Sequence, residues 1–284
     1  MPELPDLLYI KNYLQREVVE RTITGVVVRQ PIVIRNAIDL TIDRALAGRT
    51  IDAVTVHGPF LNLAVSGSLD LVLNLMLAGK VQHQKGSERG EGFLCFSLLL
   101  SDGTRLNLCD KKKMAKAYLV RHGGYSVIPR YDRQGIDVLS PEFTREKIGA
   151  LAAAHAGKQV RVFINDHTLL SAIGNAYADE ILFEARLHPK TFVRSLSPGE
   201  IDALYSSVRS VLQRAIDHVA HMQEPIQNKV RDHMQVRNRK GEPCTRCGTI
   251  IRREGVRGHD VFFCPKCQPA LRKLFIDWTA RIGK

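Results

Sequence analysis

Cys244-Thr-Arg-Cys247 and Cys264-Pro-Lys-Cys267 are two short cysteine pairs separated by sixteen residues. Four thiolates at this spacing are typical of a tetrahedral zinc site. Because all four positions are cysteine, none is left open for water, and the predicted zinc ion is structural rather than catalytic. A redox pair or two disulfides are the alternative interpretations, and the expected cytoplasmic setting disfavours both.

The residues around the two pairs predict a small zinc-ribbon hairpin. Gly248 allows a tight turn after the first pair, and two strands are expected at Thr249 to Arg253 and Val261 to Phe263. A hairpin this short has no core of its own, so the metal would hold it together. Its positive charge suits phosphate groups, and the basic side chains are Arg246, Arg252, Arg253, Arg257, His259 and Lys266.

Upstream of the cysteines, from about residue 135, the apolar periodicity is helical. The clearest helix opens with the capping box Ser197-Pro198-Gly199-Glu200 and continues as a long apolar stripe. An earlier stretch, Leu170-Ser-Ala-Ile-Gly-Asn175-Ala-Tyr-Ala-Asp-Glu180, places a glycine turn before a second helix. Asn175 is expected to be the N-cap of that helix, where backbone amides can face a phosphate. Plain helix capping is compatible with the same residue.

The first part of the chain predicts antiparallel sheet after one helix at about residues 5–18. The breaks Ser66-Gly67 and Asp102-Gly103 are hairpin signals. Short apolar or alternating runs predict strands at Thr22 to Val28, Ile51 to Val56, Leu61 to Val65, Leu69 to Leu77, Phe93 to Leu100 and Thr104 to Leu108.

The chain starts Met1-Pro2-Glu3-Leu4-Pro5-Asp6. Removal of Met1 would expose the secondary amine of Pro2, and α-amino groups titrate near neutral pH, so this amine is a candidate nucleophile. Glu3 beside it is a candidate acid and base. The alternative interpretation is that the prolines only begin a helix.

Composition points to a polyanionic partner. The chain carries 41 Lys and Arg against 29 Asp and Glu, a net charge of +12. No apolar run is long enough to span a membrane and no secretory signal precedes the first helix, so a cytoplasmic, nucleoid-associated protein is expected. Cys95 and Cys109, in apolar segments, are expected to be buried inert thiols.

The start, the sheet region, the Gly174-Asn175 turn and the terminal cysteine hairpin together resemble the formamidopyrimidine-DNA glycosylase and endonuclease VIII family, over nearly the whole chain. The resemblance implies an α+β multidomain fold. It would comprise an N-terminal catalytic antiparallel β-sandwich with flanking helices (residues 1–134), a helix-two-turn-helix DNA-binding domain (135–240) and a zinc finger with one structural Zn2+ (241–284).

The resemblance also implies a base-excision repair enzyme that acts as a monomer on damaged double-stranded DNA. Pro2 would attack C1′ of a flipped nucleotide, the damaged base would leave, and the resulting Schiff base would permit β-elimination at the abasic site. Glu3 would assist ring opening as an acid and proton shuttle. By the same resemblance, Leu77 and Met114 would wedge into the gap in the base stack, with core packing as the alternative for Leu77. Lys112 stands at a third wedge position and is an implied DNA contact, as are Asn175, Asn74 and His259.

This sequence departs from the family pattern at three phosphate-binding positions. His57-Gly58-Pro59 stands where the family usually has Arg-Gly-Lys, and that lysine binds a phosphate and supports catalysis. Asn74 replaces a histidine and His259 an arginine. The chain also lacks the glycine-rich insert that caps an oxidised purine in many members. The damaged base therefore stays open among oxidised pyrimidines, opened purines, abasic sites and bulky lesions.

Two further hypotheses remain. A lesion-binding or abasic-site-binding protein of the same fold with weak or lost catalysis is favoured by Pro59, whereas retention of Pro2 and Glu3 favours the enzyme. A zinc-ribbon nucleic-acid adaptor unrelated to repair leaves the start of the chain and the Gly174-Asn175 turn unexplained.

Overall fold

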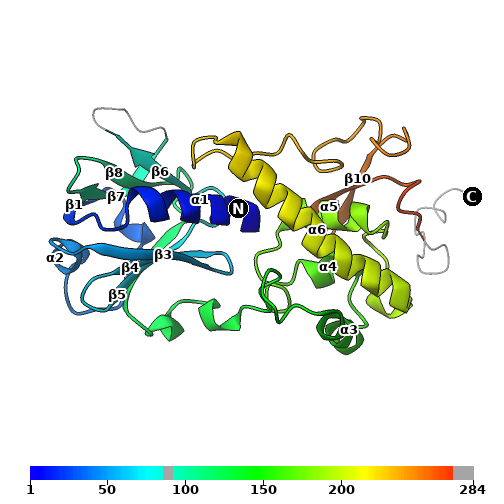
Figure 1. The fold of residues 1–284 in the computed structure, drawn as a ribbon, viewed down its shortest axis with the longest axis horizontal. Coiled ribbons are helices and arrows are strands. Elements are labelled where there is room, and N and C mark those ends of the chain that lie inside the picture. Colours follow the sequence, from blue (N-terminus) through cyan, green and yellow to red (C-terminus); the bar gives the residue numbers. More distant parts are fainter. Residues whose placement is uncertain (86–91, 271–284) are drawn as a thin grey trace, which may run out of the picture. The chain divides into compact units, whose positions relative to one another are not determined.

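A computed structural model describes residues 1–85 and 92–270 (Figure 1). The chain divides into two compact units. The sheet unit comprises Met1–Gly135 and Ala215–Arg231, and the helical unit comprises Ile136–Arg214 and Asp232–Lys284, of which the part up to residue 270 is described. The boundary at Ala215 falls inside one long helix. The three domain limits expected from the sequence stay a prediction.

The sheet unit is a β-sandwich. One sheet has the order β1-β7-β8-β6, with β1 (Ile23–Val28), β6 (Lys80–Gln84), β7 (Leu94–Leu100) and β8 (Arg105–Cys109). The other has the order β2-β9-β5-β4-β3, with β2 (Ile34–Asn36), β3 (Ile51–His57), β4 (Phe60–Val65), β5 (Leu69–Asn74) and β9 (Lys116–Arg121). Apolar side chains from both sheets form one buried core, including Phe96, Leu98, Leu63 and Leu71.

Helix α1 (Leu4–Glu17) closes this core. Its residues Leu7, Ile10 and Leu14 are at most 3% exposed and join the side chains of both sheets. Asp6 lies in its first turn and Arg16 in its last, as the helix dipole favours. The N-terminal residues are thereby anchored to the sandwich. The shorter helical elements of this unit are α2 (Ile42–Leu46), η1 (Pro31–Val33), η2 (Tyr125–Val127) and η3 (Tyr131–Arg133).

The predicted sandwich is confirmed, but three strands were not predicted. They are β2, β6 and β9, and β2 pairs with β9 in parallel rather than antiparallel. The predicted strand from Leu69 to Leu77 was too long, because Asn74 Oδ1 accepts the Met76 N–H at 3.0 Å and Met76 adopts a φ of 49°. This side-chain turn ends β5 at Asn74.

The helical unit contains α3 (Arg145–Ala154), α4 (Val160–Ile164), α5 (Asn175–Glu184), η4 (Val193–Ser195) and the first part of α6 (Pro198–Met222). The predicted capping box of α6 is present, since Ser197 N donates to Glu200 Oε2 at 2.8 Å and Glu200 N donates to Ser197 Oγ at 3.3 Å. The N-cap of α5 is Gly174, and Asn175 is the first helical residue. The expectation that Asn175 is the N-cap was therefore wrong, because its side chain is engaged elsewhere.

The hairpin at the end of this unit is formed by β10 (Arg252–Val256) and β11 (His259–Phe263). The first strand begins three residues later than predicted. A two-residue turn at Arg257-Gly258, with φ values of 47° and 78°, pairs Val256 with His259 and sets this register.

Two adjacent buried carboxylates of α5 connect this helix to the hairpin. Asp179 Oδ2 accepts from Arg237 at 2.7 Å and from the Phe262 N–H at 3.3 Å. Glu180 accepts three backbone N–H groups of residues 235–237 at 2.8 to 2.9 Å. The two residues are 1% and 6% exposed, so the segment that enters the cysteine hairpin is fixed to α5 through buried polar contacts.

Candidate functional site

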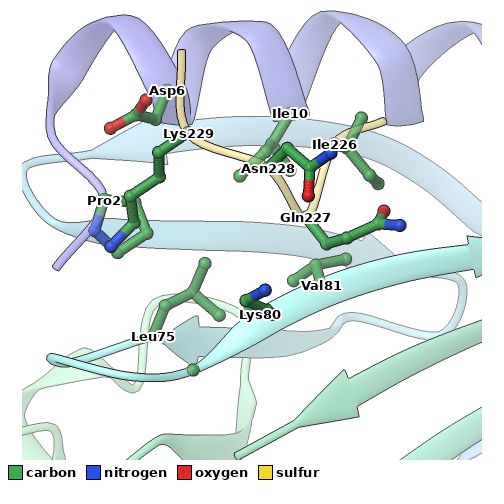
Figure 2. Close-up of a pocket in the computed structure, with 11 residues that line it drawn as sticks. Pro2, Asp6, Ile10, Leu75, Lys80, Val81, Ile226, Gln227, Asn228 and Lys229 are labelled. Atoms are coloured by element: carbon green, nitrogen blue, oxygen red, sulfur yellow. The ribbon is translucent and has the colours of Figure 1, made fainter. Parts of the chain in front are cut away.

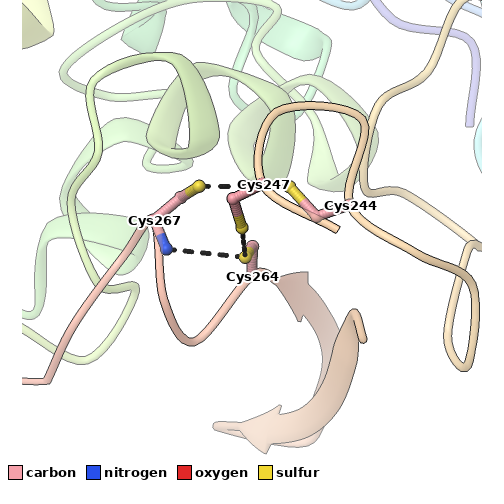
Figure 3. A group of neighbouring side chains, drawn as sticks. All are labelled: Cys244, Cys247, Cys264 and Cys267. Atoms are coloured by element: carbon pink, nitrogen blue, oxygen red, sulfur yellow. Dashed lines mark hydrogen bonds between the residues drawn. The ribbon is translucent and has the colours of Figure 1, made fainter. Parts of the chain in front are cut away.

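The four cysteines form one cluster, with every sulfur within 4.8 Å of the others (Figure 3). The Cys247 and Cys264 sulfurs are 3.5 Å apart, and those of Cys244 and Cys267 are 4.0 Å apart. Zinc-sulfur bonds of about 2.3 Å at tetrahedral angles place thiolates ~3.8 Å apart. All four thiols are free, which excludes the disulfide interpretation in this structure. The cluster therefore fits one zinc ion held by four sulfurs, as predicted.

The zinc cluster is supported by its surroundings in the helical unit. Arg246, between the first two cysteines, donates to the Phe183 carbonyl at 2.9 Å and to Glu184 Oε2 at 2.9 Å. Gln268 accepts the Cys264 N–H at 3.0 Å and donates to the Leu187 carbonyl at 2.9 Å. These contacts place the metal ligands against the end of α5.

The N-terminus is the second chemical centre, in the sheet unit. Pro2 is buried and Glu3 is 6% exposed. The Glu3 N–H donates to Asp6 Oδ2 at 2.9 Å, which fixes the first turn of α1. Arg231 donates to both oxygens of Asp6, at 2.8 and 2.6 Å. This bidentate pair connects the start of the chain to a segment 225 residues away.

A pocket opens beside Pro2, and its lining includes Leu75, Gly79 and residues 226–229. The Lys229 side chain extends toward Pro2 (Figure 2). The pocket also receives Lys80. The pocket thus places the Pro2 nitrogen, which removal of Met1 would convert to a secondary amine, together with two lysine side chains. Such a combination suits covalent chemistry on an electrophilic carbon.

The N-terminal amine has a low pKa in this setting. Burial lowers the pKa of the Met1 amine to about 6, and Lys229 contributes in the same direction, whereas Glu3 and Asp6 act to raise it. An amine with such a pKa is largely unprotonated at neutral pH.

Two loops of the sheet unit carry the predicted wedge residues, and a polar side chain shapes each. Asn74 forms the turn that leaves Leu77 59% exposed, so core packing of Leu77 is excluded here. Asp110, 2% exposed, accepts the N–H groups of Lys112, Met114 and Ala115 at 2.7 to 2.9 Å. Met114 is half-buried and Lys112 is exposed. Both loops therefore have fixed backbones.

The Leu77 loop lies at the N-terminus. The Met1 amine donates to the Leu77 carbonyl oxygen at 3.3 Å. The structure thus brings Leu77 together with the Pro2 end of the chain. Pro59 lies in the turn between β3 and β4 and is not among the residues that line the Pro2 pocket.

Asn175 begins α5 in the helical unit. Its Oδ1 accepts from Arg161 at 2.9 Å and from Asn165 at 3.2 Å. Arg161 is 1% exposed and is itself bound to Asp179 at 3.1 Å. Both contacts use the side-chain oxygen of Asn175, and the residue is half-buried.

His259 is exposed at the start of β11, next to Asp260, which pairs with Arg253 at 3.2 Å. It belongs to the helical unit with Asn175 and the cysteines, whereas Pro2, Glu3, Asn74, Leu77, Lys112 and Met114 belong to the sheet unit.

Four supporting residues were not predicted from the sequence: Lys229, Arg231, Asp179 and Glu180. Lys229 and Arg231 stand in the basic stretch before the cysteines, and charge alone does not show which side chain turns back to the N-terminus. Asp179 and Glu180 stand in a helix where acidic residues are ordinarily solvated.

A β-sandwich that anchors the N-terminus, a helical unit with a Gly-Asn turn and a four-cysteine hairpin define the class of zinc-containing helix-two-turn-helix proteins. The chain matches three domain families in this order: the formamidopyrimidine-DNA glycosylase N-terminal domain at residues 1–117, the formamidopyrimidine-DNA glycosylase H2TH domain at 135–224, and the zinc finger found in FPG and IleRS at 241–270.

Individual proteins agree with these matches. A formamidopyrimidine-DNA glycosylase of Symbiobacterium thermophilum is 32% identical over 276 residues, which cover 95% of this chain and 90% of that protein. The crystal structure of the MutM (Fpg) protein from Thermus thermophilus superposes with a TM-score of 0.82 at 30% identity, covering 94% of this chain and 98% of that one. Lactococcus lactis Fpg in complex with abasic-site DNA has the same fold, with a TM-score of 0.83 at 24% identity over 94% of this chain and all of that one (100%). The chain belongs to the formamidopyrimidine-DNA glycosylase family.

Proposed function

We propose that this protein is a base-excision repair enzyme that removes a damaged base from double-stranded DNA and cleaves the resulting abasic site. The observation that carries the proposal is Pro2, which lines a pocket and is followed by the buried Glu3, within a chain of this family. The positive net charge of +12 suits a DNA partner. Across residues 1–85 and 92–270, no helix has the length and apolar character needed to cross a membrane.

The proposed chemistry proceeds through the N-terminus. After removal of Met1, the unprotonated Pro2 nitrogen attacks C1′ of the flipped nucleotide and the bond from C1′ to the base breaks, with the base leaving in protonated form. Glu3 donates a proton to the sugar ring oxygen as the ring opens. The iminium ion that results acidifies the hydrogen on C2′, and loss of that proton expels the 3′ phosphate by β-elimination.

The DNA contacts in the proposal come from both units. Asn175, through its amide nitrogen, and His259 are the phosphate contacts of the helical unit, while Lys112 and Asn74 serve this role in the sheet unit. Leu77 and Met114 fill the gap left by the flipped nucleotide; Leu77 is 59% exposed on a fixed loop, as a wedge requires. We also propose that the protein acts as a monomer and is cytoplasmic.

Borohydride trapping tests the proposal. The purified protein, with loss of Met1 verified by mass spectrometry, is incubated with duplex DNA that carries one abasic site, and borohydride reduces the Schiff base to a stable adduct. We expect an adduct with the wild-type protein, none with Pro2→Ala, and a retained adduct with Pro5→Ala, which leaves the N-terminal amine unchanged. DNA binding without any adduct, although Met1 is absent, would overturn the catalytic proposal.

A lesion-binding protein with weak catalysis is the second candidate, and Pro59 is the observation that favours it. Proline at this position offers neither a charge nor an N–H donor to a phosphate. If the missing lysine limits the reaction, Pro59→Lys raises the lyase rate on abasic DNA. An unchanged or lower rate in a folded variant would show that another group has replaced that lysine.

A further inference from the structure

The segment at residues 224–231 is fixed along α1 at both of its ends. Tyr9 on α1 donates to the Glu224 carbonyl at 2.7 Å, and Arg231 forms the bidentate pair with Asp6. Between these points Ile226, 5% exposed, enters the core of the sandwich. Lys229 is therefore carried by a segment whose path past the N-terminus is determined by three separate anchors.

The position of Lys229 beside the N-terminus has a chemical consequence. Lys229 and Pro2 line the same pocket, and Figure 2 shows the Lys229 side chain extending toward Pro2. Two positive charges at such a short separation repel each other, so a charged Lys229 disfavours protonation of the amine beside it. An α-amine is a weaker base than a lysine amine by about 2 pH units, so the N-terminal amine is the one that loses its proton.

We propose that Lys229 is a positioning residue for the nucleophile: its ammonium group, held beside the N-terminus, keeps the Pro2 amine unprotonated. The inference rests on the proposed function and adds a residue to it. A second cation next to an amine nucleophile is an established way to activate it.

Other charged groups face the same amine. Glu3 and Asp6 on α1 act to keep the amine protonated. Arg231 neutralises Asp6 through its bidentate pair. This pairing weakens the tendency of the Asp6 carboxylate to keep the amine protonated. Lys80 on β6 also lines the pocket and adds positive charge. Among the positive groups, Lys229 is the one whose side chain extends toward Pro2 (Figure 2).

The pH dependence of borohydride trapping tests this role. The trapping rate of the full-length protein on abasic duplex DNA is measured from pH 5 to pH 9 for wild type, Lys229→Met and Lys229→Arg. For Lys229→Met we expect the midpoint of the rising limb to move up by about one pH unit, with a rate about tenfold lower near pH 6 and unchanged near pH 9. Lys229→Arg keeps the positive charge and is expected to retain the wild-type midpoint.

Lys11→Met is the matched control, because it removes one lysine charge from the exposed face of α1. It is expected to leave the midpoint unchanged. Lys229 is exposed on a loop, so its variants should fold, and thermal unfolding checks this. A wild-type midpoint in Lys229→Met, or an equal loss of rate at every pH, would overturn the role of Lys229 while the Pro2-dependent adduct still supports the proposed function. Absence of that adduct in the wild-type protein would overturn the proposed function itself.

Discussion

The cysteine cluster and the Pro2 pocket are the two chemical centres of this chain, and they depend on opposite kinds of contact. The cysteine ligands are close in sequence, since Cys264 follows Cys247 by 17 positions and Cys267 follows Cys244 by 23. The Pro2 pocket depends on Asp6 and Arg231, which are 225 residues apart. A metal can stabilise the first centre locally, whereas the second exists only when the whole sheet unit is folded.

This difference predicts how each centre responds to substitution of its residues. Loss of one ligand should abolish the zinc site at once, because binding and folding of a small hairpin are the same event. Loss of a contact at the Pro2 pocket should be graded, because α1 and the sandwich core support the pocket independently. Four substitutions test the comparison, in order of decreasing effect.

Cys264→Ser should have the largest effect. The Cys264 side chain is fully buried, and zinc binding contributes roughly 10 kcal/mol to the folding of small zinc hairpins. We expect loss of bound zinc, measured by atomic emission, together with loss of DNA binding; removal of zinc by a strong chelator should do the same. Cys95→Ala, which changes a buried thiol of the sandwich, should keep its zinc. A full zinc content in Cys264→Ser would contradict the four-sulfur assignment.

Arg231→Ala tests the long-range contact of the Pro2 pocket. It leaves the Asp6 carboxylate, whose side chain is 5% exposed, without its cation, and breaking such a buried pair costs about 3 kcal/mol. The measurement is the free energy of unfolding in urea. The control is Arg239→Ala, which removes a surface pair with Glu242 three residues away and should cost less than ~1 kcal/mol. Equal losses in the two variants would show that the sequence separation of the partners does not matter.

Glu180→Gln asks whether the cysteine hairpin is held only by local contacts. The variant keeps one side-chain oxygen as an acceptor, but its NH2 group cannot accept the N–H contacts made by the other oxygen, which are those of Val236 and Arg237 or that of Gln235. The expected cost is about 2 kcal/mol. We expect a lower free energy of unfolding with an unchanged zinc content. Glu184→Gln, one turn later on α5 and partly exposed, is the matched control and should be nearly neutral. If Glu180→Gln loses zinc as well, zinc binding by the cysteine cluster also depends on the contacts of Glu180 with residues 235–237.

Asp166→Asn should have the smallest effect, because its partners Lys158 and Thr168 are near in sequence and the site is partly exposed. Although burial opposes the shift, hydrogen bonds from Lys158 and Thr168 lower the pKa of Asp166 to about 2. A lowered folded-state pKa stabilises the protein above pH ~4, and this contribution is lost as the pH falls from about 4 to about 2. The stability of the variant, measured by thermal unfolding, should therefore lie below that of wild type at pH 6 by about 1 kcal/mol or less, and meet it near pH 2. A difference that persists at pH 2 would assign the effect to packing.

The sequence predicted most strands of the sandwich but not all of them, and the missed strands show why. β6 reads Lys-Val-Gln-His-Gln and shows no apolar alternation that marks a strand. β9 reads Lys-Ala-Tyr-Leu-Val-Arg, a short apolar run that is consistent with a buried strand but also with a buried helix. Both are strands because neighbours pair with them: β8 with β6, and β5 with β9. Asn175 shows the same limit, since its position in the turn was predictable but its engagement by Arg161 was not.

The sequence by itself determined the zinc site, the Met1-Pro2-Glu3 start and the family, because each depends on residues that are adjacent or regularly spaced along the chain. The tertiary structure alone decided that Arg231 neutralises Asp6 and that Lys229 lies next to Pro2. The physical reason is that charge pairing acts over a few ångströms in space, and only the folded sandwich brings residues from the two ends of the chain within that distance.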